Sequence, residues 1–465
     1  MDFSTLLFIA IVVIGIYKLL HSQGTATPFE ATFDSTLSVG NFLNHGFSLG
    51  SHTLYATEDD SDRHCMVVGT TGAKKTTSCY ANSVCNILKR TDHSIFGVQP
   101  SRDAFTYTAG FAHEKGRNVF EIDFTNPNAW GFNVLDEVNS VQDITNVVST
   151  LVENSEAAPK GGDFWKTSAK DFISFWVRVI LTYPKEYRTF SNVLRLIEYF
   201  AIGKTDELIV KIGDPDLLRT YKTYVANSPN TMQGIVSQAK SCLSCYANPT
   251  IQRTTSVAQS ISLNTLRFQS SYVVLTSPIT AYSYIRPIIS TFVEAMYNRF
   301  LSYIPDFSKE KKIYMLLDEV GNYRLQNLPM YLATARKHGL PSMLILQQKT
   351  SLIGMYSKSE YDTICANSNL QVYLPPVIDL ETTTELSKRL GTHTRKDEDD
   401  KKMRHALLTP AEISRLDKAI VINGSKTTLA TVKPYYTSTE FSRYSKLPVP
   451  EIETTFPDEV PLITL

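Results

Sequence analysis

A glycine-containing turn between a predicted strand and a predicted helix has the residue types needed to hold phosphate groups. Backbone N–H groups can surround a phosphate, a lysine can reach the β- and γ-phosphates, and the next hydroxyl can hold Mg²⁺. We predict Lys75 for the lysine role and Thr76 for the Mg²⁺ role. The residues expected to contact the nucleotide are Gly69, Thr70, Thr71, Gly72, Ala73, Lys74, Lys75, Thr76 and Thr77.

The turn departs from the pattern GxxxxGK[ST] at one position, because Lys74 stands where the pattern has glycine. Glycine is used where the backbone must approach a ligand closely or adopt a conformation that side chains disfavour. A side chain here would crowd the phosphates or strain the turn. We therefore expect nucleotide binding and identify Lys74 as a residue that can impair turnover.

A second motif has the carboxylates that complete a nucleotide site. The apolar residues Ile313–Leu317 are followed directly by Asp318 and Glu319, the Walker B arrangement. Asp318 would hold Mg²⁺, and Glu319 would polarise the attacking water. A core strand that ends in surface acids has the same pattern in isolation. Because both motifs follow strands, together they predict a P-loop fold that binds a nucleoside triphosphate with Mg²⁺.

Two further polar residues are candidates for catalysis. Gln347 ends the strand after the acidic pair, where it would lie beside the γ-phosphate and orient water; the alternative is a polar residue at a strand edge. Arg336, near the end of a predicted helix, is a candidate arginine finger that reaches a neighbouring subunit's nucleotide. The alternative for Arg336 is a cation that stabilises a helix C-terminus. The predicted catalytic set is Lys75, Glu319, Gln347 and Arg336.

Short apolar strands alternate with helical patterns around these motifs. Strands are predicted at 65–68, 94–98, 118–122, 272–275, 313–317, 342–346 and 370–374. Helices are predicted at 78–88, 285–301 and 328–337. Strands separated by helices indicate an α/β fold with a mostly parallel sheet that is covered on both faces.

The pattern changes over residues 141–262, where helical apolar stripes replace the strands. We predict an all-α insertion domain within an α/β nucleotide-binding domain, whose two parts are residues 22–140 and 263–440. Residues 441–465 contain several prolines among acidic residues, which predicts an extended tail.

The composition limits the class of protein. The chain has 465 residues, 46 Lys and Arg against 46 Asp and Glu, and 20% charged and 43% apolar residues. These values exclude a disordered protein and a polytopic membrane protein. Zero net charge also excludes DNA binding through a generally basic surface, so basic groups that contact nucleic acid must be concentrated in one place. Six cysteines are too few for a disulfide scaffold.

Residues 1–21 predict a transmembrane anchor. The stretch 3–17 is apolar apart from two hydroxyl residues, and Lys18 follows it. This is short of the roughly 20 residues that a spanning helix needs, but Lys18 can reach the lipid headgroups. Positive charge after the stretch places the bulk of the chain in the cytoplasm. A buried helix and a cleaved signal peptide are the alternatives.

Several further segments resemble, in the same order, the coupling ATPases of type IV secretion and conjugation systems. The resemblance covers about residues 60–440. Besides the two motifs it includes segments 101–105, 108–111, 123–127, 131–135, 163–165, 333–339, 344–347 and 407–413. That family has a RecA-like motor domain with an inserted all-α domain, so the resemblance implies the same architecture here, behind an N-terminal transmembrane helix.

The resemblance also implies a function. It implies a homo-hexameric ATPase, anchored by a single pass in the bacterial inner membrane, with most of the chain cytoplasmic. Such an enzyme passes a relaxase with attached single-stranded DNA, or a protein effector, to the components of a type IV secretion channel. The sequence departs from the family at Lys74, and at Gln99 and Ser101, where relatives often carry Asp and Lys. It also has one predicted transmembrane segment where many relatives have two.

Two other functions remain open from the sequence. The first is a docking platform that binds nucleotide and substrate but hydrolyses weakly, which Lys74 favours. The second is a double-stranded DNA translocase of the chromosome-segregation type, which shares the motor core. The helical insertion and the segment 407–413 argue against this second alternative.

Overall fold

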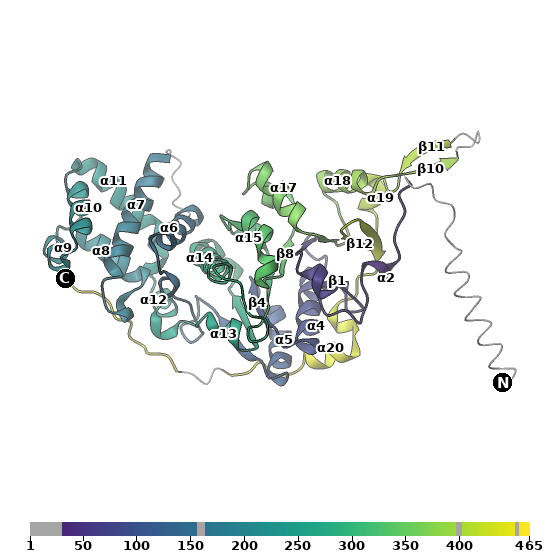
Figure 1. The fold of residues 1–465 in the computed structure, drawn as a ribbon, viewed down its shortest axis with the longest axis horizontal. Coiled ribbons are helices and arrows are strands. Elements are labelled where there is room, and N and C mark those ends of the chain that lie inside the picture. Colours follow the sequence, from purple (N-terminus) through teal and green to yellow (C-terminus); the bar gives the residue numbers. More distant parts are fainter. Residues whose placement is uncertain (1–29, 156–162, 397–401, 452–454) are drawn as a thin grey trace. The chain divides into compact units, whose positions relative to one another are not determined.

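The computed structural model describes residues 30–155, 163–396, 402–451 and 455–465. The chain divides into two compact units, and the larger combines Ser35–Pro376 with Asp417–Leu465. The smaller unit contains the chain up to Asp34 together with Val377–Leu416. Figure 1 labels some of the helices and strands of both units.

A nine-stranded sheet organises the larger unit (Figure 1). Its strands lie in the order β13-β12-β9-β3-β8-β7-β4-β6-β5. From β9 to β5 all neighbours are parallel, whereas β12 pairs antiparallel with both β9 and β13. The bounds are β3 Cys65–Val68, β4 Ser94–Gln99, β5 Asn118–Ile122, β6 Ser271–Thr276, β7 Ile313–Leu317, β8 Ser342–Leu346, β9 Leu370–Tyr373, β12 Ala419–Asn423 and β13 Lys426–Ala430.

The seven predicted strands form the parallel part of this sheet. Six of them are buried along their whole length, and only β5 at the sheet edge is partly exposed. A strand covered on both faces must be apolar at every position rather than at every second one, which is why these strands are visible in the sequence. The predicted α/β class with a large parallel sheet is confirmed.

Helices cover both faces of the sheet. On one face, α4 (Ala81–Arg90) and α5 (Asp103–Glu114) belong to one buried apolar cluster with alternate strand residues such as Val67 and Tyr314. On the other face lies α14 (Tyr282–Leu301), whose Phe292 ring is 5.2 Å from that of Phe96 in β4. Successive side chains of each strand point to opposite faces of the sheet, so each strand packs against the helices on both sides.

Helices follow one another in the chain between β5 and β6. The bounds are α6 Val141–Asn154, α7 Asp163–Ile180, α8 Phe190–Ala201, α9 Asp206–Ile212, α10 Pro215–Val225, α11 Pro229–Cys242, α12 Pro249–Thr254 and α13 Asn264–Phe268. Aromatic side chains fill the space between α7, α8 and α10, where the Trp176 ring lies 5.8 Å from Phe200 and 6.4 Å from Tyr221. The exact domain boundaries given from the sequence stay predictions.

The smaller unit contains a two-stranded ribbon and two helices. Its elements are α18 (Leu380–Leu390), β10 (Thr392–Lys396), β11 (Lys402–Ala406) and α19 (Pro410–Ser414), and the two strands pair antiparallel. The sequence-based division included these residues in the second part of the nucleotide-binding domain and did not separate them. The ribbon has few apolar residues, so it carries no core signal of its own.

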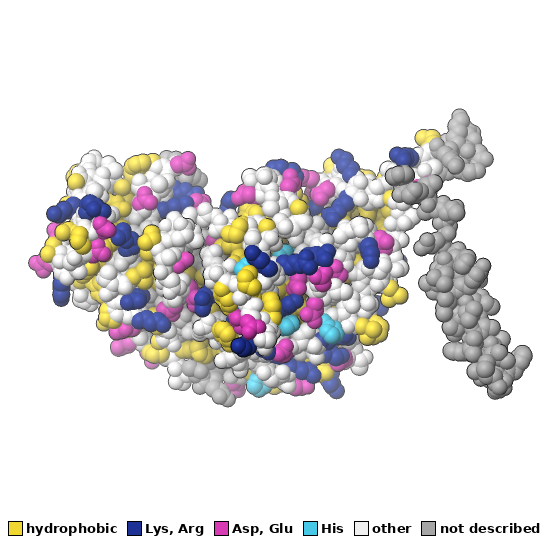
Figure 2. All heavy atoms as spheres, in the orientation of Figure 1, with side chains coloured by type: hydrophobic (Ala, Val, Ile, Leu, Met, Phe, Trp, Pro, Cys, Tyr) yellow, Lys and Arg dark blue, Asp and Glu magenta, His cyan; other side chains and the backbone are white. Residues whose placement is uncertain are grey.

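The predicted transmembrane segment, residues 1–21, lies outside the described residues. Among the helices that the structure describes, none combines the length and the apolar character that crossing a membrane requires. On the face drawn in Figure 2, basic and acidic side chains are interspersed, as the zero net charge leads one to expect.

Candidate nucleotide-binding site

The predicted phosphate-binding turn joins β3 to a helix at the carboxyl edge of the sheet. The helix begins with one π-helical turn, Thr76–Tyr80, and continues as α4. Gly69 is closely packed, because a Cβ there would lie 3.0 Å from the Ala73 Cβ and 3.1 Å from the Leu374 Cβ. Gly72 has a φ of +83°, a conformation that glycine adopts readily.

Lys74 adopts a left-handed backbone conformation with a φ of +64°. This explains why the general motif has glycine at this position, since a Cβ destabilises that conformation. Hydrogen bonds hold the Lys74 carbonyl in place: it accepts from the Ser78 N–H at 2.8 Å, the Ser78 hydroxyl at 2.7 Å and the Thr77 hydroxyl at 3.3 Å. The Lys74 side chain is exposed, so the cost of this lysine in the chain lies in its backbone.

The Lys75 ammonium is buried under its own loop. Its Nζ donates to the Gly69 carbonyl at 2.8 Å and to the Thr70 carbonyl at 3.3 Å, and lies 3.9 Å from Glu319 Oε1. The side chain is 8% exposed. An ammonium with three donors can exchange the two carbonyls for phosphate oxygens without leaving the site.

The two carboxylates follow β7. Asp318 is 4% exposed; its Oδ2 accepts from the Thr76 hydroxyl at 3.5 Å and its Oδ1 from the Glu319 N–H at 3.0 Å. Burial and the neighbouring Glu319 charge raise the pKa of Asp318 to about 7. Glu319 itself has a φ of +50°, a strained conformation of the kind that collects at functional sites.

Strand β8 lies between β3 and β7, so the residue after β8 enters the same site. That residue is Gln347, whose Nε2 donates to Glu319 Oε1 at 3.1 Å. Glu319 therefore contacts both Lys75 and Gln347. Three of the four predicted catalytic residues, Lys75, Glu319 and Gln347, thus meet at one edge of the sheet.

Arg336 is the predicted site residue that the structure does not bring to this edge. It lies in the short helical turn Ala335–His338, and its guanidinium pairs with Asp59 at 2.7 Å. Both side chains are more than half exposed. Its role as an arginine finger toward a neighbouring subunit stays a prediction.

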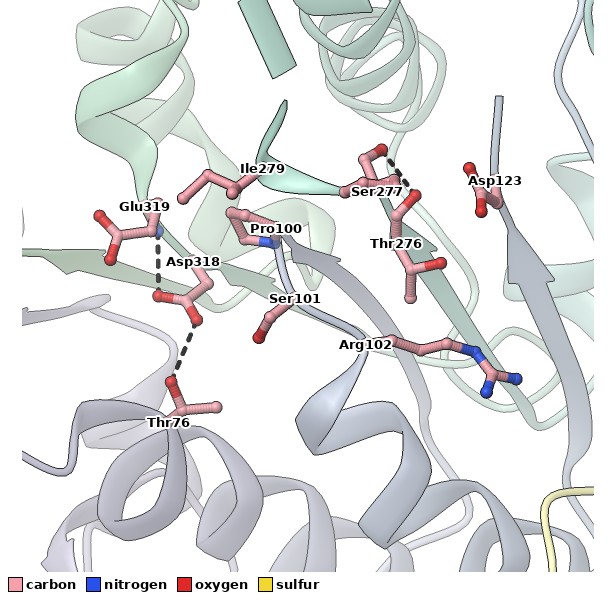
Figure 3. Close-up of a pocket in the computed structure, with 11 residues that line it drawn as sticks. Thr76, Pro100, Ser101, Arg102, Asp123, Thr276, Ser277, Ile279, Asp318 and Glu319 are labelled. Carbon is pink, nitrogen blue, oxygen red and sulfur yellow. Dashed lines mark hydrogen bonds between the residues drawn. The ribbon is translucent and has the colours of Figure 1, made fainter. Parts of the chain in front are cut away.

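A cavity of about 420 Å³ opens beside the carboxylates (Figure 3). Figure 3 shows Thr76, Asp318 and Glu319 on one side of it and Arg102 and Asp123 on the other. Arg102 forms a two-point ion pair with Glu121, with 2.7 Å between Nη2 and Oε2. Sequence reasoning did not identify these residues as part of the site. A signal was present in the sequence, because Arg102 follows β4 and Asp123 follows β5, and the carboxyl ends of both strands lie at this edge.

The donor set fits a Mg²⁺ ion. The Thr76 hydroxyl and the Asp318 carboxylate supply the oxygen ligands that Mg²⁺ prefers, and they face each other across 3.5 Å. Asp318 is buried with a raised pKa, and a divalent cation would favour its ionised form. The structure thus brings together the two predicted metal ligands.

Comparisons with known proteins give one family and a group of solved structures. A family model described as "Type IV secretory system Conjugative DNA transfer" matches residues 27–455. No curated protein sequence matches. Plasmid coupling protein TrwB in complex with the GTP analogue GDPNP has a TM-score of 0.67 at 18% identity, over 88% of this chain and 96% of that chain.

Two other solved structures extend this comparison. TrwB in complex with ADP and Mg²⁺ has a TM-score of 0.68 at 18% identity, over 88% of this chain and 95% of that chain. VirB4 of Thermoanaerobacter pseudethanolicus has a TM-score of 0.55 at 11% identity, over 87% of this chain and 100% of that chain. At these identities the likeness is one of fold, and the RecA-like P-loop motor fold is confirmed.

Proposed function

Because this chain belongs to the type IV secretory system conjugative DNA transfer family, we propose that it is a membrane-anchored ATPase that drives DNA transfer. Its substrate would be a relaxase with attached single-stranded DNA, or a protein effector, delivered to a type IV secretion channel. The observation that carries the proposal is the meeting of Lys75, Thr76, Asp318, Glu319 and Gln347 at one sheet edge.

Each of these residues has a chemical task in the proposed reaction. Lys75 would exchange the Gly69 and Thr70 carbonyls for the β- and γ-phosphate oxygens of ATP. Thr76 and Asp318 would hold Mg²⁺, which when bound neutralises phosphate charge. Glu319 would accept the proton of the attacking water, and the contact between Gln347 and Glu319 would fix the position of both groups around that water.

The setting of the enzyme is part of the same proposal. We place it at the bacterial inner membrane, with residues 1–21 as a single-pass anchor and the motor in the cytoplasm. A homo-hexamer would put Arg336 of one copy near the nucleotide of the next. The family description, conjugative DNA transfer, supports the assignment of DNA as cargo.

The test is ATP turnover by the full-length chain with and without single-stranded DNA. We expect stimulation by the DNA and loss of turnover in Lys75→Ala. Lys211→Ala, at an exposed position of α9, is the matched control and should behave like wild type. Turnover that persists in Lys75→Ala would contradict the site. Stimulation by duplex DNA alone would instead favour a double-stranded DNA translocase.

One observation favours the second candidate, a docking platform with weak hydrolysis. Lys74 holds the turn in a strained conformation, and Lys75 is bonded to the turn's own carbonyls. A Cβ at Lys74 destabilises the turn conformation in which the motif uses glycine, and Lys75 must give up its two carbonyl bonds when phosphate binds. Nucleotide binding without turnover in the natural chain, together with turnover in Lys74→Gly, would support the platform. Equal turnover in the two proteins would exclude it.

A further inference from the structure

The end of the chain is bound to the helical insertion. Residues 455–465 form no helix or strand, yet Ile463 is only 4% exposed. The segment reaches α8, and in Figure 1 the C-terminal end of the chain lies next to this helix. A buried residue in a segment without secondary structure indicates that specific contacts hold it.

Asn192 in α8 binds two backbone groups of this segment. Its Nδ2 donates to the Pro461 carbonyl at 2.9 Å, and its Oδ1 accepts from the Ile463 N–H at 2.9 Å. The carbonyl of residue i and the N–H of residue i+2 are the pair that an extended strand offers to its neighbour. The side-chain amide thus replaces a peptide group of an adjacent strand.

Asn192 is completely buried when the segment lies on α8. Its Nδ2 also donates to the Tyr187 carbonyl at 2.8 Å, which holds the amide in one orientation. Without the segment, the Oδ1 and one N–H of this amide would lose their protein partners and need water in their place. A polar group left unsatisfied is disfavoured, so the amide favours the state in which the segment is bound.

Two more donors on the same helix face contact the segment. Arg195 Nε donates to the Ile463 carbonyl at 3.1 Å, and the Tyr199 hydroxyl donates to the same oxygen at 3.4 Å. Asn192, Arg195 and Tyr199 are spaced three and four residues apart, which aligns them along one stripe of α8. The stripe contacts backbone atoms of Pro461 and Ile463, and the Ile463 side chain is buried.

A second anchor holds the preceding part of the segment. The Phe456 ring packs edge-on against Trp130 at 5.0 Å, and Asp458 pairs with Arg253 at 3.1 Å. Asp458 is 93% exposed, so this ion pair contributes little. Affinity for the segment therefore depends on the aromatic contact and on the α8 stripe.

We propose that the α8 stripe of Asn192, Arg195 and Tyr199 is a peptide-binding site for an extended segment with one buried aliphatic residue. Its occupant is the C-terminal segment of this chain, residues 455–465, bound reversibly through its backbone. Recognition of backbone atoms gives affinity, and burial of the Ile463 side chain gives specificity, as in other modes of strand recognition. The proposal goes beyond ATP-driven transfer and does not depend on it.

The test uses the full-length chain and a fluorescent peptide with the sequence of residues 455–465. In wild type the attached segment competes at an effective concentration in the millimolar range, so the peptide should bind weakly. Ile463→Asp should release the attached segment, because a charged aspartate is disfavoured at this buried position, and should tighten peptide binding about tenfold or more. Leu465→Asp, at a more exposed position of the same segment, should bind the peptide as weakly as wild type.

Two further measurements decide the proposal. Adding Arg195→Ala and Tyr199→Phe to Ile463→Asp should weaken peptide binding again by about tenfold, and a peptide with Asp in place of Ile463 should not bind. In wild type, the Ile463 amide should exchange its hydrogen slowly, because it donates to Asn192. A freely exchanging Ile463 amide, or peptide binding that ignores the Arg195 and Tyr199 substitutions, would overturn the proposal.

Discussion

Replacing Lys74 by glycine tests the link between the backbone of the turn and its stability. In the left-handed conformation, with a φ of +64°, a residue with a Cβ loses about 1–2 kcal/mol relative to glycine. Glycine in turn costs about 0.5–1 kcal/mol, because the unfolded chain becomes more flexible. The midpoints of these two ranges differ by about 0.75 kcal/mol, so Lys74→Gly should stabilise the closed turn by about 0.5–1 kcal/mol, even though it removes a long side chain.

Local hydrogen exchange measures this free energy directly. A stabilisation of 0.5–1 kcal/mol should slow amide exchange in the peptide that covers residues 65–88 by about two- to fivefold. The matched control is Lys222→Gly, an exposed lysine inside α10 with ordinary helical geometry. There glycine brings no conformational relief, so exchange in α10 should be about fivefold faster, which corresponds to about 1 kcal/mol.

The two lysine variants must thus change exchange in opposite directions. If Lys74→Gly accelerates exchange in the turn as Lys222→Gly does in α10, the left-handed backbone is not a source of strain. In that case the hydrogen bonds from Ser78 and Thr77 to the Lys74 carbonyl would already compensate for the Cβ.

Three further predictions concern the carboxylates and one close backbone contact. The pKa of Asp318 is raised from 3.8 to about 7, so folding favours the protonated form of its carboxyl group. As pH rises from 4 to 8, the free energy of unfolding of wild type should fall by up to about 4 kcal/mol relative to that of Asp318→Asn. Urea unfolding at each pH measures both free energies, and the same pH dependence in the two proteins would refute this prediction. Glu319→Gln should bind ATP normally yet lower turnover by about 100-fold or more, and normal DNA transfer by this variant would refute the role of Glu319. Gly131→Ala should cost about 3 kcal/mol in thermal unfolding, because its Cβ would lie 1.7 Å from the Thr254 carbonyl oxygen, whereas Gly354→Ala, with 3.6 Å to its nearest neighbour, should change stability little.

The parallel strands could be predicted because their burial leaves a simple pattern. Strands such as β3 and β7 are covered on both faces, so each is a short run of apolar residues. The ribbon of β10 and β11 has no such apolar run, so only the pairing of its two strands in the structure identifies it. The apolar strand β12 was not identified, although it carries the same signal as the central strands.

The site could be predicted as far as it depends on residues at strand ends. Lys75, Asp318 and Gln347 follow β3, β7 and β8, and the adjacency of these strands brings them together. The position of Arg102 across the cavity depends on β4 and β6 being neighbours, which no local pattern encodes. The left-handed Lys74 was foreseen only as a departure from glycine, because a backbone angle is not visible in a residue list.

The C-terminal segment shows the same limit. An extended tail was predicted over 441–465; residues 455–465 form neither helix nor strand, but helix α20 (Thr439–Tyr444) extends into the first part of that range. The segment's binding partners are Asn192, Arg195 and Tyr199, polar residues of a helix that is otherwise largely apolar. A buried asparagine in a sequence can satisfy its amide in many ways, so the contact required the structure.

The strand order also determines when the nucleotide site can form during synthesis. Strand β3 pairs with β8 and β9, which begin at Ser342 and Leu370, so its partners leave the ribosome long after it does. At 5–20 residues per second this delay is on the order of 15 to 60 s. Helices α7 to α11 contact mainly one another and can fold within this delay. The nascent chain therefore carries an unpaired apolar strand and no nucleotide pocket until translation is nearly finished, which makes this strand the expected target of chaperones.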